Sequence, residues 1–216
     1  MSKPEIAMIA LCIALTAGPS GAEGWSGRWY GVTFGYGSGT YGLGVSKLNQ
    51  VGPPVDVEAA LIGLRYTQQT EHGNTVRGLD AEVSTGPNGE SPIDTFADDW
   101  ACITGACNVS LKWLVTLRGR VGMLINPKTL AYGAAGLAVG RVEGGIWDSE
   151  QQGASTSTGF TVGVGFERMM RENLTVFGEA NVTDLGTLEF GTDGFVQTFD
   201  GKGDFATVKF GVNYRF

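Results

Sequence analysis

The sequence predicts an all-β fold, namely an eight-stranded antiparallel transmembrane up-and-down β-barrel. Three observations predict it. Segments of alternating apolar and polar residues recur along the chain, the connections between them alternate between short and long, and the chain ends on an aromatic residue within a regular strand. The composition agrees, because 35 of 216 residues are glycine and only 17% are charged, against a usual charged fraction of about 25%.

The chain is expected to comprise a signal peptide, residues 1–22, and a single barrel domain, residues 23–216. Lys3 supplies a positive charge, Ile6–Ala17 forms an apolar segment of 12 residues, and Ser20-Gly21-Ala22 provides the small residues of a cleavage site. Twelve apolar residues are too few to span a bilayer as a helix. The alternative is a buried N-terminal helix.

Eight alternating segments are predicted to form the strands. The last is the clearest, because Val208, Phe210 and Val212 alternate with Lys209 and Gly211, and successive side chains of a strand point to opposite faces. The fifth has small residues on both faces and no clear facing. The predicted strands are Arg28–Gly37, Ala59–Gln69, Thr75–Thr85, Val109–Ile125, Leu130–Glu143, Gly159–Met169, Leu174–Thr187 and Gly203–Phe216.

The connections alternate in length. Those after the second, fourth and sixth strands are short, at Thr70–Asn74, Asn126–Thr129 and Met170–Asn173. The others are long and rich in turn-forming residues, with Gly37–Glu58 as the first and Gly86–Asn108 as the longest. This alternation predicts an antiparallel meander with two unlike ends.

The same pattern fits a soluble barrel with an apolar interior or a membrane barrel with its apolar face towards lipid. The polar face favours the membrane barrel, because it carries charges of both signs, and a narrow lumen can hold these as a buried network only if they pair. The alternative is the solvated outer face of a soluble sheet. The predicted lumen ion network consists of Arg65, Asp80, Glu82, Arg118, Arg120, Glu167, Glu179, Lys209 and Arg215.

Aromatic residues on the apolar face also favour a membrane barrel, because they fall near strand ends, where aromatic side chains prefer the membrane–water interface. They are Tyr30, Tyr36, Tyr66, Trp113, Phe160, Phe166, Tyr214 and Phe216. The final segment, Val208–Phe216, resembles the C-terminal signature of bacterial outer-membrane barrels. By this resemblance Tyr214 and Phe216 form an assembly signal read by the barrel-assembly machinery.

Further motifs resemble one family, the small outer-membrane barrel proteins of the opacity type, or "porin family", of alphaproteobacteria. They are Trp25–Val32, Gly78–Val83, Leu117–Gly122, Leu130–Ala138, Gly159–Glu167 and Asp184–Gly186, in the order of the family's strands. The resemblance implies an eight-stranded barrel in the outer membrane, with both termini in the periplasm and four surface loops. The chain departs from the family pattern in its long first connection and in a cysteine pair in the second long connection.

The cysteine pair of the exported chain is Cys102 and Cys107, for which a disulfide is expected. The alternative is a metal site, although two cysteines without a nearby histidine are a poor zinc set.

The one histidine, His72, falls in a short turn without a nucleophile beside it. No phosphate-binding loop is present. We therefore expect no enzyme and no cofactor.

The net charge of −7 and a pI near 4.7 argue against nucleic acid as a partner. The acidic residues concentrate in the long connections, which suggests divalent cations bridging to lipopolysaccharide phosphates; the alternative is a hydrated surface without a specific ligand. These residues are Asp56, Glu58, Glu90, Asp94, Asp98, Asp99, Glu143, Asp148, Glu150, Glu189, Asp193, Asp200 and Asp204.

The predicted role is structural or surface-interacting, in envelope integrity or loop-mediated recognition, with outer-membrane lipid and lipopolysaccharide as the surroundings. The alternative is a narrow channel for small solutes. A general diffusion porin is not expected, because eight strands leave an interior only wide enough for side chains. A third interpretation is a soluble secreted barrel that binds a small apolar ligand. The sequence leaves the oligomeric state open.

Overall fold

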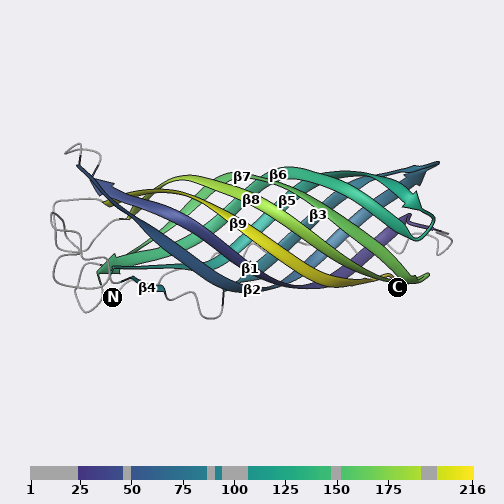
Figure 1. Cartoon of the computed structure of the whole chain (residues 1–216), viewed down its shortest axis with the longest axis horizontal. Helices are drawn as coiled ribbons and strands as arrows, with labels where there is room; N and C mark the ends of the chain where they lie inside the picture. The colour runs from purple at the N-terminus through teal and green to yellow at the C-terminus, as the bar shows by residue number, and fades with distance from the viewer. Residues whose placement is uncertain (1–23, 46–49, 87–90, 94–106, 147–151, 191–198) are drawn as a thin grey trace, which may run out of the picture.

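The computed structural model describes residues 24–45, 50–86, 91–93, 107–146, 152–190 and 199–216. These residues form long antiparallel strands that slant around a common axis (Figure 1). The predicted signal peptide and Cys102 lie outside the described residues. The strands are β1 Gly27–Val45, β2 Gln50–His72, β3 Thr75–Thr85, β4 Ser91–Ile93, β5 Cys107–Asn126, β6 Thr129–Ile146, β7 Gln152–Arg171, β8 Leu174–Phe190 and β9 Phe199–Tyr214.

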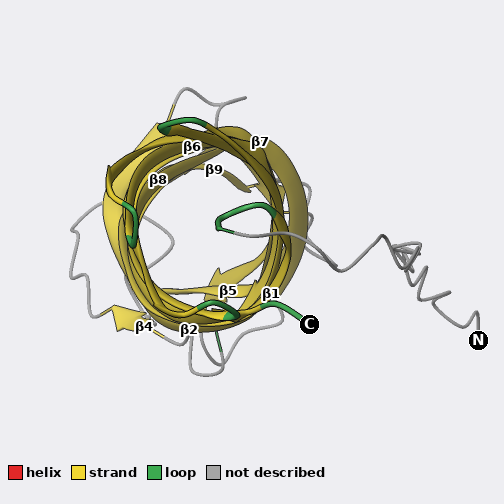
Figure 2. Ribbon diagram, turned by 90° about the vertical axis from the view of Figure 1, so that its right-hand side faces the viewer, coloured by secondary structure: helices red, strands yellow, loops and turns green. Residues whose placement is uncertain are grey.

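Eight of these strands close into a barrel. β1 pairs with both β2 and β9, and β3 pairs with β5, so that the ladder returns to its first strand. Figure 2 shows the resulting ring viewed from one end. The short β4 is additional and lies beside β5. The predicted eight-stranded antiparallel barrel is confirmed. Among the described residues, no helix is long and apolar enough to cross a membrane.

The first hairpin is longer than the sequence predicted. Most of Gly37–Glu58 belongs to β1 and β2 rather than to a loop, and their pairing continues to Val45 and Gln50. Backbone hydrogen bonding extends these strands where glycine and proline interrupt the side-chain alternation, so the pattern ended too early. The turn from β2 to β3 is shorter than the predicted Thr70–Asn74, because β2 continues to His72 and β3 begins at Thr75. Gly73 supplies its left-handed conformation at φ +60°.

The alternation of side chains is that of a membrane barrel. On β7, Phe160 and Val164 are 70% and 65% exposed, whereas the intervening Thr161 and the later Glu167 are buried. The other long strands repeat the arrangement, with apolar side chains outward and polar side chains inward. Lipid rather than water suits such an outer face, because water would leave a continuous apolar belt uncovered.

In two strands, only the structure shows which side chains point into the lumen. In β6, Tyr132, Ala134 and Val142 point inward and are buried, which resolves the strand whose facing the sequence left open. In β5, the alternation that puts Arg118 and Arg120 in the lumen also puts Lys112 inside and Leu111 outside, but in the structure Leu111 is buried and Lys112 is exposed. The ladder between β5 and β6 shifts between Leu111 and Trp113, and such an irregularity reverses the facing of residues on one side of it.

Gly136 of β6 offers a test of this packing. A Cβ atom at this position would overlap the backbone carbonyl oxygen of Leu117 in β5, which cannot move without breaking the ladder. We expect Gly136→Ala to reduce the yield of folded, heat-modifiable barrel severely. Gly119→Ala in the adjacent strand is the control, because its Cβ would have the Ala135 oxygen at 3.9 Å as its near neighbour. Equal folding of the two variants would contradict the expectation.

Candidate functional site: the lumen and its base

The centre of the lumen holds a compact ion network. Arg65 Nη2 of β2 lies 2.9 Å from Asp80 Oδ2 of β3 and 2.9 Å from Glu179 Oε2 of β8. Arg118 of β5 completes the arrangement, with its Nε at 2.8 Å from Asp80 Oδ1 and its Nη1 at 2.7 Å from Glu179 Oε1. All four side chains are at most 1% exposed. The network therefore links strands on opposite sides of the barrel.

Aromatic side chains surround these charges. The Tyr132 hydroxyl donates to Glu179 Oε2 at 2.8 Å. The guanidinium of Arg65 lies 4.6 Å from the centroid of the Phe177 ring, and that of Arg120 lies 3.9 Å from the centroid of the Tyr132 ring. Stacking of a guanidinium on an aromatic face compensates part of the cost of removing the cation from water.

Two further ion pairs flank the centre. Arg120 Nη2 lies 2.7 Å from Glu167 Oε2, and Lys209 Nζ lies 2.6 Å from Glu82 Oε1. Glu167 also accepts hydrogen bonds from the Thr175 hydroxyl and from Asn213 Nδ2. The structure thus brings eight of the nine predicted network residues together in the lumen, four of each sign.

Arg215 is a correction to the predicted network. It lies beyond the end of β9 rather than among the lumen carboxylates. Its guanidinium stacks on the Trp29 ring at 4.7 Å and donates to the backbone oxygens of Gly24, Ser26 and Glu172. Parity along the strand placed this residue on the inward face, but the strand ends at Tyr214 and the long side chain reaches the N-terminal segment instead.

That N-terminal segment closes the base of the barrel. Trp25 precedes β1, yet it is only 1% exposed, because it packs in a buried cluster with Val76, Leu130 and Tyr132. Leu124 and Met169 pack against the same cluster. An indole is thereby held at the end of the barrel that bears the short turns.

Hydrogen bonds fix the Trp25 segment on every side. The Trp25 backbone N–H donates to Glu71 Oε2 at 2.8 Å, and the indole Nε1 donates to the Pro127 oxygen at 3.2 Å. The Trp25 carbonyl accepts from Gln69 Nε2 at 2.9 Å and from Trp29 Nε1 at 3.3 Å. The segment therefore contacts several strand ends and turns at once.

In the sequence, Trp25 and Trp29 were noted only as part of the family motif Trp25–Val32, and no place in the lumen was predicted for them. The alternation could have placed them, because Trp25 and Trp29 fall on the same alternating positions as Gly31 and Thr33, which face the lumen. Bulky aromatics on a face otherwise made of glycine and threonine indicate that the interior is filled at that level.

The arrangement limits what the lumen carboxylates can do. Two pairs of lumen carboxylates, Asp80 with Glu82 and Glu167 with Glu179, are candidates for acid–base chemistry by residue type alone. In the structure, each of the four accepts from an arginine or lysine at 2.9 Å or less. A carboxylate engaged in this way is an acceptor in a structural network.

Other sequence candidates contribute little to a site in the described residues. His72 is exposed at the end of β2, and Cys107 is the first residue of β5, while its expected disulfide partner lies outside the described residues. Glu143 pairs with Lys112 at 3.2 Å on the exposed outer end. In the part of the chain that the structure describes, no group of three or more acidic, histidine or cysteine side chains is arranged to hold a metal ion.

The C-terminal aromatics form a cluster on the outer face near the base. The Tyr30 ring lies 5.4 Å from that of Tyr66 and 5.6 Å from that of Phe216, and the Tyr214 and Phe216 rings lie 4.9 Å apart. Phe216 remains 91% exposed. Such a group is typical of the aromatic girdle at a membrane interface.

Comparison with known sequences decides the family. The profile described as "Outer membrane protein beta-barrel domain" matches residues 7–216. The chain belongs to this outer-membrane β-barrel family. The resemblance to outer-membrane barrel proteins of alphaproteobacteria is confirmed, and so is the location in the bacterial outer membrane.

Relatives of this barrel carry matching names. The "31 kDa outer-membrane immunogenic protein" of Brucella melitensis is 28% identical over 94% of this chain and 88% of its own length. The "22 kDa outer membrane protein" of Rhizobium leguminosarum is 33% identical over 59% of this chain and 57% of its own length.

Solved structures share the fold of this barrel. The outer membrane protein AlkL matches with a TM-score of 0.53 and 13% identity, covering 92% of this chain and 94% of AlkL. OprG of Pseudomonas aeruginosa matches with a TM-score of 0.51 and 12% identity, covering 90% of this chain and 98% of OprG.

Proposed function

We propose that this outer-membrane barrel is a closed, non-catalytic protein that serves envelope integrity or surface recognition. The observation that carries the proposal is the double closure of the lumen. The ion network fills its centre, and the Trp25 cluster fills its base. Eight strands leave an interior only wide enough for side chains, so two filled levels leave little room for a solute.

The orientation of the barrel assigns recognition to the long connections. Bacterial barrels have short periplasmic turns and longer extracellular loops, which puts the Trp25 cluster and the C-terminus on the periplasmic side. The Brucella relative is named an outer-membrane immunogenic protein, which fits a protein with recognisable surface segments. Divalent cations and lipopolysaccharide at the acidic connections, and the barrel-assembly machinery at Tyr214 and Phe216, stay predictions about its partners.

Bilayer recording tests the closed lumen. The mature chain, refolded and inserted into a planar lipid bilayer, is expected to give no reproducible conductance step. A general-diffusion porin in the same membrane controls for the recording. A reproducible step from the refolded chain would overturn the closed barrel and favour the alternative.

The alternative is a narrow channel for small solutes. It is favoured by the polar lumen, in which some buried atoms have no protein partner, among them Arg118 Nη2, Thr67 Oγ1 and Thr116 Oγ1. Buried polar groups of this kind are commonly satisfied by water, and a connected file of water would conduct. The same recording separates the two candidates.

A further inference from the structure

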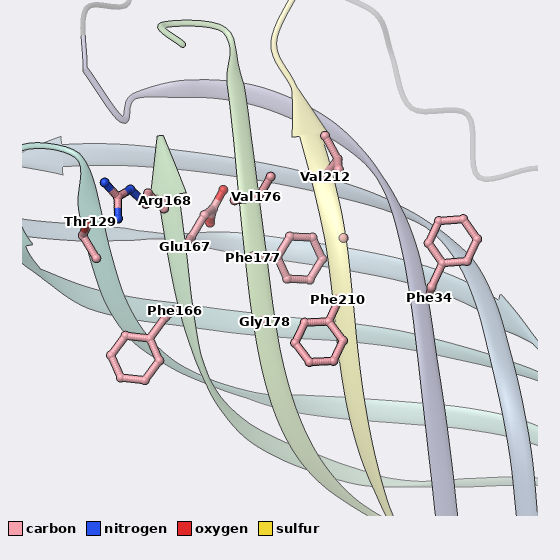
Figure 3. A pocket seen from close by; sticks show the side chains of 11 residues that line it. Phe34, Thr129, Phe166, Glu167, Arg168, Val176, Phe177, Gly178, Phe210 and Val212 are labelled. Atoms are coloured by element: carbon pink, nitrogen blue, oxygen red, sulfur yellow. The ribbon is translucent and has the colours of Figure 1, made fainter. Parts of the chain in front are cut away.

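The outer face of the barrel carries an open apolar groove of about 610 Å³ across β7, β8 and β9 (Figure 3). Phe166, Val176, Phe210 and Val212 line it with exposed side chains. Residues that alternate with them, such as Phe177, are buried towards the lumen. The lining also includes Glu167 and Phe177, whose side chains are buried towards the lumen, whereas the exposed side chains of the groove face lipid.

The strand register explains why the surface is hollow here. Gly178 of β8 pairs with Phe166 of β7 on one side and with Phe210 of β9 on the other. Phe210 in turn pairs with Phe34 of β1. Phe166, Phe210 and Phe34 therefore form a row of aromatic residues across the strands, and Gly178 leaves a gap in that row. A Cβ atom on Gly178 would touch only the edge of the Phe210 ring, at 3.3 Å.

Cations lie at the end of the groove towards the short turns. In the next row, Val212 pairs with Val176, which pairs with Arg168. In the row after that, Leu174 pairs with Arg171. Both arginines are exposed on the same side of the barrel as the groove, and Arg168 is among the groove residues.

A third cation is held nearby by the backbone. The carbonyl oxygen of Lys128, in the turn between β5 and β6, accepts from the Met169 N–H at 2.8 Å. Lys128 is exposed. Of the acidic residues near this end, Glu167 points into the lumen towards Arg120, and Glu172, in the turn between β7 and β8, is exposed. Positive charge therefore dominates this end of the groove.

We propose that the groove and its cations bind one anionic glycerophospholipid. An acyl chain lies over Gly178 between Phe166 and Phe210, and the phosphate contacts Arg168, Arg171 and Lys128. Long basic side chains at a membrane interface lay their stems on apolar surface and direct their charge to the headgroup level. The inference rests on the periplasmic placement of the short turns in the proposed function, because the periplasmic leaflet supplies phospholipid rather than lipopolysaccharide.

Native mass spectrometry of the refolded mature barrel in detergent tests the site. The probes are phosphatidylglycerol and phosphatidylethanolamine with identical acyl chains. The wild type is expected to bind phosphatidylglycerol more tightly. In the double variant Arg168→Gln and Arg171→Gln, its affinity falls by about fivefold for each charge removed. The affinity for phosphatidylethanolamine falls less, because its ammonium group offsets the charge of its phosphate.

A matched control removes the same kind of charge elsewhere. Lys112→Gln lies on the outer face at the opposite end of the barrel, and it is expected to leave the preference for phosphatidylglycerol unchanged. Gly178→Leu fills the groove and is expected to weaken binding of both lipids. Heat-modifiable migration on a gel shows that each variant is folded, and the exposed arginine variants carry the test if Gly178→Leu does not fold.

Several outcomes would overturn the proposal. They are equal binding of the two lipids by the wild type, unchanged binding by the arginine variants, displacement by free glycerol phosphate, or tighter binding of lipid A. Displacement by glycerol phosphate would indicate a simple phosphate site, and preference for lipid A would indicate an outer-leaflet ligand. Conductance in the bilayer recording would instead overturn the closed lumen and leave the lipid measurement unaffected.

Discussion

Replacing Glu179 by alanine is expected to destabilise the barrel by about 3–5 kcal/mol, because it breaks a buried ion network from one side. Glu179 bridges Arg65 and Arg118 and accepts from the Tyr132 hydroxyl. Without it, two buried guanidinium groups share the single carboxylate of Asp80. The measurement is the urea midpoint of refolded protein in lipid vesicles, followed by heat-modifiable migration.

A surface pair provides the control for Glu179. Glu143→Ala removes the partner of Lys112 in an ion pair whose side chains are 45% and 42% exposed, and such exposed pairs contribute at most about 1 kcal/mol. Glu179→Gln keeps the shape and one acceptor oxygen but removes the charge, so it is also expected to destabilise. If Glu179→Ala shifted the midpoint no more than Glu143→Ala does, the central network would not be a major source of stability.

Replacing Trp25 by alanine is expected to cost about 3–5 kcal/mol, the usual range for removing a fully buried tryptophan. The substitution leaves a cavity among Val76, Leu130 and Tyr132 and removes the indole hydrogen bond to the Pro127 oxygen. The same urea titration measures the change. In bilayer recordings the variant is expected to stay silent, because the ion network still fills the lumen above the base.

The control for Trp25 is Trp113→Ala, near the opposite end of the barrel, where the side chain is only partly buried. Its smaller burial predicts a smaller loss of stability. Equal losses of stability in the two variants would show that the Trp25 cluster is not a major source of stability. A conductance step in Trp25→Ala alone would show that the base, rather than the ion network, closes the lumen.

Alternation along each strand predicted much of the lumen without any tertiary information. A strand sends successive side chains to opposite faces, so the parity of Asp80 and Glu82 or of Arg118 and Arg120 was sufficient to place them inside. The same alternation fails at Lys112, because the register shift between Leu111 and Trp113 reverses the facing of the residues beyond it. It was also wrong at Arg215, because this residue lies past the end of β9, where its guanidinium meets the Trp29 ring and backbone oxygens rather than the lumen carboxylates.

The sequence by itself determined the eight strands of this barrel, its inverted polarity and most of its lumen charges, because these follow from a period of two that is local to each strand. Only the tertiary structure decided which charges meet, since Arg65 and Glu179 are 114 residues apart and lie side by side through barrel closure and register. The Trp25 cluster and the groove over Gly178 were decided in the same way. Each is assembled from neighbouring strands or turns, and a contact between strands depends on how they are aligned rather than on the order of residues in any one of them.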